Sequence, residues 1–118
     1  MIVPTVQQLS AALSVAPQLD VDAMAWAAQQ GFKSVIINRP DFEGGPEQPT
    51  SAAIGAAAAA AGLAYAWLPV APGYQSPEEV AQFAELVATL PKPVLAFCRS
   101  GARSGRLYSM SLVSRDAG

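Results

Sequence analysis

The side chain with the clearest chemistry is the only cysteine, Cys98, which is followed at once by the polar stretch Arg99–Ser104. A free cysteine usually packs as a small apolar side chain. A segment with two arginines and two serines is unsuited to an apolar core, so we interpret Cys98 as a nucleophile. Because the sequence contains no histidine, backbone N–H groups and arginine, rather than a neighbouring base, must lower the pKa of the thiol.

The residues after Cys98 predict a loop that binds an anion. Gly101 allows the tight backbone curl that turns successive N–H groups toward one sulfur atom, and a helix after the loop adds its dipole. We expect Arg103 to be the main electrostatic anchor. Ser104 either donates a hydrogen bond to the sulfur or caps the helix, and Arg99 either attracts anions at the rim or is a solvated charge. The remaining candidate anion-binding residues of the loop are Ser100 and Ala102.

Two further candidates for anion or substrate binding, Arg39 and Asp41, come directly after a predicted strand at residues 34–38. The end of that strand should lie at the same edge of the sheet as Cys98. Asp41 could act as a general acid for a leaving oxygen, or it could simply start a turn after Pro40; aspartate is common in turns, which favours the second interpretation. Arg39 could line the anion site or bond Asp41.

Short apolar runs alternate with helical patterns along the chain. The run at 34–38 is rich in β-branched residues, which is typical of a strand buried on both faces. The predicted strands are 13–17, 34–38, 64–68 and 94–97, and the predicted helices are 23–30, 50–61, 76–90 and 104–113. This alternation predicts an α/β fold with a mostly parallel sheet of four to five strands and helices on both faces. In such a sheet ligands bind at the carboxyl ends of the strands, where Cys98 falls.

Composition narrows the function further. With 118 residues, about half of them apolar, the chain is expected to form a single domain over residues 1–118. A net charge of −2 predicts no nucleic-acid partner, and the single cysteine and missing histidine predict no disulfide, metal or other cofactor. Proline and glycine interrupt the uncharged stretch 48–77, so we expect no membrane span. The N-terminus lacks a secretory pattern, so we expect a cytoplasmic protein.

Four aromatic residues have spacings typical of a core, so we expect them to be buried: Trp26, Tyr65, Trp67 and Phe83.

The sequence resembles a known family. The loop Cys98–Ser104 looks like the active-site loop of rhodaneses, in which a Cys-x4-Arg stretch surrounds a persulfide. Four other short segments, together with this loop, resemble the phosphatase-like domain of the beta-lactamase hydrolase-like proteins, catalogued as domain of unknown function 442. Those segments are Gln18, Ile37–Asp41, Leu68–Val70 and Pro93–Leu95. The resemblance implies a fold similar to dual-specificity phosphatases, that is, a cysteine-phosphatase-like and rhodanese-like domain.

From the loop we expect a sulfurtransferase. Its Cys98 would take sulfane sulfur from thiosulfate or glutathione persulfide, form a persulfide and pass the sulfur to a thiol or cyanide. The family resemblance implies a persulfide dioxygenase or another sulfide-oxidising enzyme as a partner. Two alternatives remain open. One is a cysteine-dependent phosphatase acting through a phosphocysteine, although such enzymes use Cys-x5-Arg and here the arginine, Arg103, comes one residue early. The other is a sulfur carrier without turnover.

Overall fold

Three short runs, buried at every position, form the centre of one sheet in the computed structural model of this protein, which describes residues 4–117. They are β2 (Leu13–Ala16), β3 (Ser34–Ile37) and β5 (Val94–Phe97). The edge strands are β1 (Gln7–Gln8) and β4 (Ala64–Trp67), and the strand order is β1-β2-β5-β3-β4. Only β1 pairs antiparallel. The predicted mostly parallel α/β sheet is confirmed.

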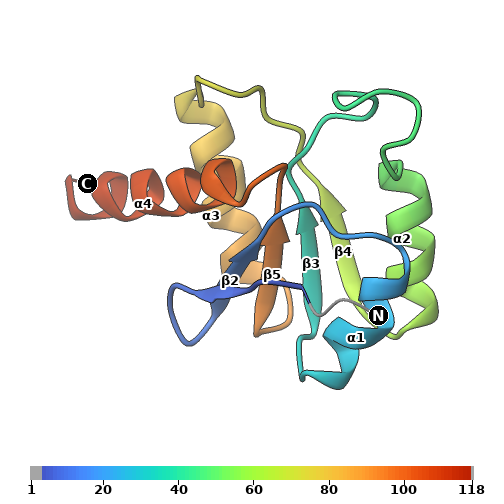
Figure 1. Cartoon of the computed structure of the whole chain (residues 1–118). Coiled ribbons are helices and arrows are strands. Elements are labelled where there is room, and N and C mark those ends of the chain that lie inside the picture. Colours follow the sequence, from blue (N-terminus) through green and yellow to red (C-terminus); the bar gives the residue numbers. More distant parts are fainter. Residues whose placement is uncertain (1–3, 118) are drawn as a thin grey trace.

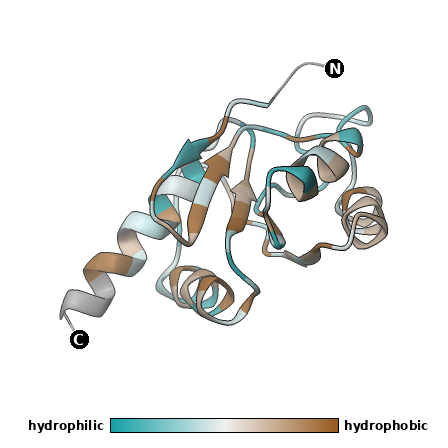
Figure 2. Ribbon diagram, turned by 90° about the horizontal axis from the view of Figure 1, so that it is seen from below, coloured by the Kyte–Doolittle hydropathy of each residue, from teal (hydrophilic) through white to brown (hydrophobic). Residues whose placement is uncertain are grey.

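Two pairs of helices cover the two faces of this sheet (Figure 1). The helices are α1 (Asp22–Gln29), α2 (Ser51–Ala60), α3 (Pro77–Thr89) and α4 (Ala102–Ala117). Apolar side chains of α1 and α2 pack with one set of strand residues, while those of α3 and α4 pack with the alternate set. This follows from the two-residue period of a strand. In Figure 2 the apolar strands accordingly lie between the helical layers.

The helices begin where short polar side chains can accept hydrogen bonds from free N–H groups, as expected. Asp20 accepts from the backbone of Ala23, and Thr50 accepts from Ala53. Ser76 and Glu79 form a complete capping box at the start of α3. The predicted bounds of α4, 104–113, were wrong at both ends: the helix begins at Ala102 and ends at Ala117, so Arg103 lies in the first helical turn.

The prediction of a core position is confirmed for Phe83, which is fully buried, but is wrong for two aromatics of β4. Tyr65 is 48% exposed and Trp67 is 47% exposed, because β4 is an edge strand. Trp67 instead donates its indole N–H to the carbonyl of Arg39 at 3.2 Å. Trp26 is only partly buried.

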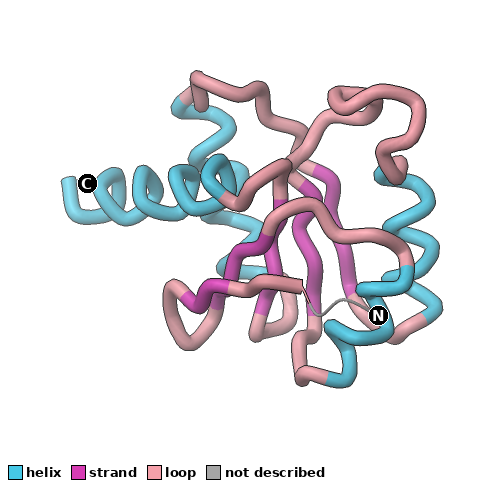
Figure 3. The backbone as a smooth tube through the Cα atoms, in the orientation of Figure 1, coloured by secondary structure: helices cyan, strands magenta, loops and turns pink. Residues whose placement is uncertain are grey.

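The loops that follow the parallel strands gather at one edge of the sheet (Figure 3). They bring together segments that are far apart in sequence: the residues after β2, β3, β4 and β5. Cys98, Arg39 and Asp41 were predicted to lie at this edge of the sheet, at the carboxyl ends of the parallel strands.

Over the residues that the structure describes, no helix has the length and apolar character to cross a membrane.

Candidate active site

Cys98 lies at the carboxyl end of β5, whose neighbours in the sheet are β2 and β3. Its side chain is almost fully buried, with 1% exposed. Among the described residues, two apolar clusters form the core, and Cys98 belongs to neither. The N–H of Gly101 donates a hydrogen bond to the Cys98 Sγ atom at 3.1 Å. Cys98 is therefore buried among polar main-chain groups rather than in an apolar interior.

The loop between β5 and α4 curls because Gly101 adopts a left-handed backbone angle, with φ of +93°. Glycine adopts this angle without strain, whereas other L-residues rarely do. The Gln18 N–H donates to the Arg99 carbonyl at 3.1 Å, which ties the loop to the segment after β2. The side chains of Arg99, Ser100 and Ala102 face outward and are exposed.

Main-chain N–H groups govern the protonation of Cys98. Burial raises the pKa of the thiol, but hydrogen bonds from the backbone of Ser104, Ser100, Arg103 and Gly101 outweigh burial, and the net pKa lies below the ordinary value of 9.0. The first turn of α4 also directs its dipole at this position. The Gly101 N–H, which is bonded to Sγ, and the backbones of Ser100, Arg103 and Ser104, which lower the thiol pKa with it, form a ring of main-chain groups around the sulfur.

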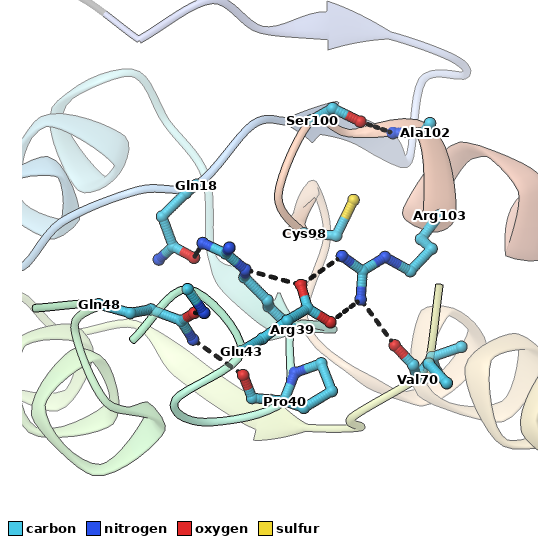
Figure 4. A network of polar contacts seen from close by, with 12 residues as sticks. Gln18, Arg39, Pro40, Glu43, Gln48, Val70, Cys98, Ser100, Ala102 and Arg103 are labelled. Atoms are coloured by element: carbon cyan, nitrogen blue, oxygen red, sulfur yellow. Dashed lines mark hydrogen bonds and ion pairs between the residues drawn. The ribbon is translucent and has the colours of Figure 1, made fainter. Parts of the chain in front are cut away.

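Arg103 is buried and is held by a carboxylate that the sequence analysis did not identify, that of Glu43 (Figure 4). Its two terminal nitrogens donate to the two carboxylate oxygens at 2.7 and 2.8 Å, and Nη1 also donates to the Val70 carbonyl at 2.8 Å. The hydrogen bond from Arg103 lowers the pKa of Glu43, and the same bond raises the pKa of Arg103. The Cys98 thiolate raises the Arg103 pKa further.

Arg39 completes the polar network but does not bond Asp41, so that alternative was wrong. Its Nε donates to Glu43 Oε1 at 2.9 Å, and its Nη1 donates to Gln18 Oε1 at 3.2 Å. Glu43 therefore lies between the two arginines, as Figure 4 shows. A line of contacts runs from the end of β2 through Arg39 and Glu43 to Arg103.

Asp41 caps α2. One carboxylate oxygen accepts from the Ser51 N–H at 2.7 Å and the other accepts from the Ser51 hydroxyl at 2.9 Å. Residues 41–44 form a turn, as the turn interpretation expected, whereas the use of both carboxylate oxygens at the start of α2 was not anticipated by either interpretation. The structure places Asp41 in the fold of its own loop rather than against Cys98.

The backbone of Ser104 lowers the pKa of Cys98, while its hydroxyl neither bonds the sulfur nor caps the helix. The hydroxyl donates to Asn38 Oδ1 at 2.9 Å, and Asn38 Nδ2 donates to the Leu68 carbonyl at 3.0 Å. Since Ser104 and Asn38 are both fully buried, these bonds fix the start of α4 to the ends of β3 and β4. Both alternatives for the hydroxyl, a bond to sulfur and a helix cap, were wrong.

The site offers anion-binding groups but no set of metal ligands. Within residues 4–117, no group of three or more histidine, cysteine, aspartate or glutamate side chains could hold a metal ion. A cavity of about 530 Å³ borders the outer side of the loop at Ser100, Gly101 and Ala102, and all of its lining residues are uncharged. The arrangement places a thiolate nucleophile beside groups that can bind a small anion.

Comparisons with known proteins agree with this geometry. The family model of the beta-lactamase hydrolase-like protein, phosphatase-like domain, matches residues 5–114. The beta-lactamase hydrolase-like protein of Xylella fastidiosa (strain Temecula1) is 38% identical over 101 residues, which is 86% of this chain and 23% of that protein. The chain thus spans less than a quarter of the length of that relative.

Two solved structures place the fold among the phosphatases. A candidate phosphatase of Neisseria meningitidis Z2491 is 34% identical, with a TM-score of 0.80 over 86% of this chain and 72% of that one. The core catalytic domain of the S. cerevisiae PP-IP phosphatase SIW14 is 14% identical, with a TM-score of 0.68 over 90% of this chain and 64% of that one. The latter likeness concerns the fold alone, which is of the cysteine-phosphatase type.

Proposed function

This chain belongs to the family of the beta-lactamase hydrolase-like protein, phosphatase-like domain, and we propose that it is a cysteine-dependent phosphatase. It hydrolyses phosphate monoesters through a phosphocysteine at Cys98. The observation that carries the proposal is the ring of backbone N–H groups around the buried Cys98 sulfur, on a fold shared with phosphatases. A thiolate held in such a ring is a nucleophile at neutral pH.

The proposed reaction has two steps. The Cys98 thiolate attacks phosphorus, the bond from phosphorus to the ester oxygen breaks, and the leaving alkoxide or phenoxide takes a proton from water. A second water then attacks the phosphocysteine and loses a proton to the hydroxide left by the first step, the phosphorus–sulfur bond breaks to regenerate the Cys98 thiolate, and inorganic phosphate leaves. The loop N–H groups and Arg103 stabilise the charge on the transferred phosphoryl oxygens in both steps.

The size of the loop also favours phosphate over the sulfurtransferase that the sequence analysis expected. That expectation relied on the arginine five positions after Cys98, which suggested a ring too small for a tetrahedral anion. However, the backbone of Ser104, six positions after Cys98, is also among the groups that lower the pKa of the Cys98 thiol. The main-chain groups that act on the sulfur therefore extend beyond Arg103, and the position of the arginine alone does not set the size of the ring.

A sulfurtransferase of rhodanese type stays a second candidate on one observation, the Cys-x4-Arg spacing of Cys98 and Arg103. The comparisons reported above offer it no support. Both candidates require the same thiolate and the same ring of donors, so they differ only in the group that Cys98 accepts.

One pair of assays separates the two candidates. Purified protein is given an aryl phosphate in one assay and thiosulfate with cyanide in another, each alongside Cys98→Ser. We expect phosphate release by the wild-type protein and none by the variant. Thiocyanate formation without phosphate release would overturn the phosphatase proposal and favour the sulfurtransferase.

A further inference from the structure

The loop between β3 and α2, residues 39–49, is organised by its own side chains although it contains no regular structure. Gln48 is buried and spans the loop: its Nε2 donates to the Pro40 carbonyl at 2.8 Å, and its Oε1 accepts from the Gly44 N–H at 2.7 Å. Asp41 anchors the same loop to α2 through Ser51. The loop is therefore held in one shape, and Glu43 is held with it.

The backbone is strained next to Glu43. Phe42 has a φ of +64°, which is unfavourable for a bulky L-residue. Its side chain is 62% exposed, so packing of the ring does not account for the conformation. Strain of this kind persists where the surrounding structure fixes it, and it is typical of functional positions. Phe42 directly precedes Glu43 in the chain, so its conformation helps to position the Glu43 carboxylate.

Gly44 makes room for the second arginine of the network. A Cβ atom at this position would lie 2.7 Å from Arg39 Nη2, so a side chain here would displace the guanidinium. Arg39 can therefore approach Glu43 closely enough for Nε to donate at 2.9 Å. One carboxylate thus meets two arginines, and its own side chain is 20% exposed.

This arrangement determines which hydrogen-bond donors of Arg103 are used. A guanidinium carries five N–H donors. Two of them go to Glu43 and a third goes to the Val70 carbonyl. The two that remain are the Nε donor and one donor of Nη2. Because bidentate pairing fixes the plane of a guanidinium, the direction of these two donors is fixed as well.

We propose that Glu43 is a positioning residue, which holds Arg103 so that its two remaining donors face the anion bound at Cys98. The inference rests on the proposed function for the identity of that anion, a phosphoryl group. It goes further in assigning a role to a carboxylate on another loop, 60 residues earlier in the chain. Arg39 serves the same end by fixing Glu43 from its other side.

The test compares Glu43→Gln with Glu47→Gln, a matched control because Glu47 is an exposed carboxylate of the same loop. Anion binding is measured as the protection of Cys98 by inorganic phosphate against alkylation with iodoacetamide, which needs no turnover. Turnover of an aryl phosphate is measured separately. Glutamine keeps the size of the side chain but loses the charge and one acceptor, so Arg103 is no longer held by a bidentate pair.

We expect Glu43→Gln to need about tenfold more phosphate for half protection and to lose about 100-fold in kcat, as slight misplacement of a positioned group does. Glu47→Gln should match the wild-type protein in both assays. If phosphate protects Glu43→Gln as well as the wild type, or better, the proposal is overturned; tighter protection would show that Glu43 competes with the anion for Arg103.

Gly44→Ala keeps every charge and is the second variant if Glu43→Gln does not fold. Its methyl group displaces Arg39, and a smaller loss of phosphate protection in the same direction is expected. Unchanged protection in this folded variant would also count against the proposal. A wild-type protein that phosphate protects but that releases no phosphate from esters would refute the proposed function alone, whereas no protection of the wild type would refute both.

Discussion

Two loops at the same edge of the sheet solve different structural problems. The loop after β5 directs several backbone N–H groups at one atom, Cys98 Sγ. The loop after β3 pairs side chains instead, with Asp41 on Ser51, Gln48 on the main chain and Glu43 on Arg103. The first loop therefore depends on backbone conformation and the second on side-chain partners elsewhere in the chain. We therefore expect substitutions in the loop after β5 to abolish the reaction itself, and substitutions in the loop after β3 to change the position of Arg103 or the stability of the fold.

The largest expected effect is that of Cys98→Ser in the loop after β5. A serine hydroxyl is not ionised at neutral pH, so the ring of donors has no thiolate to present. We predict a loss in phosphate release on the order of 10⁴-fold or more, since the nucleophile itself is removed. Initial rates with an aryl phosphate measure this effect.

The control for this variant is its stability. Serine is close to cysteine in size, so the midpoint of thermal unfolding should stay near that of the wild type. If Cys98→Ser retains substantial phosphate release, Cys98 is not the nucleophile, and the loop after β5 has no chemical role to contrast with its neighbour.

Arg103→Lys breaks the link between the two loops. Lysine keeps the positive charge but cannot occupy both Glu43 oxygens and the Val70 carbonyl in the same planar arrangement. We predict a loss in kcat of about 100-fold, the size expected for one oriented donor to a developing anion. Steady-state kinetics beside a thermal melt measure it; a kcat equal to that of the wild type would mean that charge alone suffices.

The two loops also differ in how well the sequence predicted them. The cysteine loop was recognised because its residues are contiguous and each has a local meaning: Gly101 for the turn and Arg103 for the charge. The four longer strands and the helices were predicted to within two residues at most boundaries, since apolar runs and caps such as Thr50 and Ser76 are also local signals.

What could not be predicted depends on contacts distant in sequence. Nothing near Glu43 indicates that its partner is Arg103, 60 residues later; the spacing of Arg39 and Glu43 was the only available hint. The exposure of Tyr65 and Trp67 likewise depends on β4 being an edge strand, which local periodicity does not reveal. Local sequence patterns therefore predict helices and strands, whereas the partner of a side chain can be identified only once the order of the strands in the sheet is known.

Asp41→Ala tests whether the loop after β3 is only a scaffold at this position. The variant removes both acceptors of Ser51 at the start of α2 and should lower the free energy of unfolding by about 1 kcal/mol, the usual cost of a lost helix cap. Urea unfolding measures this change. Asp41→Asn keeps one oxygen acceptor and should lose less stability, with a kcat close to that of the wild type. A large loss of kcat in a stable Asp41→Asn would restore Asp41 as a general acid.

The smallest effect concerns pH and isolates the ion pair that joins the two loops. Because its partners lower the pKa of Glu43 below 4.5, ionised Glu43 stabilises the folded state fully above that value. The contribution disappears as the pH falls through the lowered pKa in the folded protein. We predict that the difference in unfolding free energy between wild type and Glu43→Gln is constant from about pH 7 to about pH 5 and shrinks toward about pH 3. Urea titrations at these pH values measure it; because the other carboxylates titrate in both proteins, a difference independent of pH would show that the charge of Glu43 does not hold the loops together.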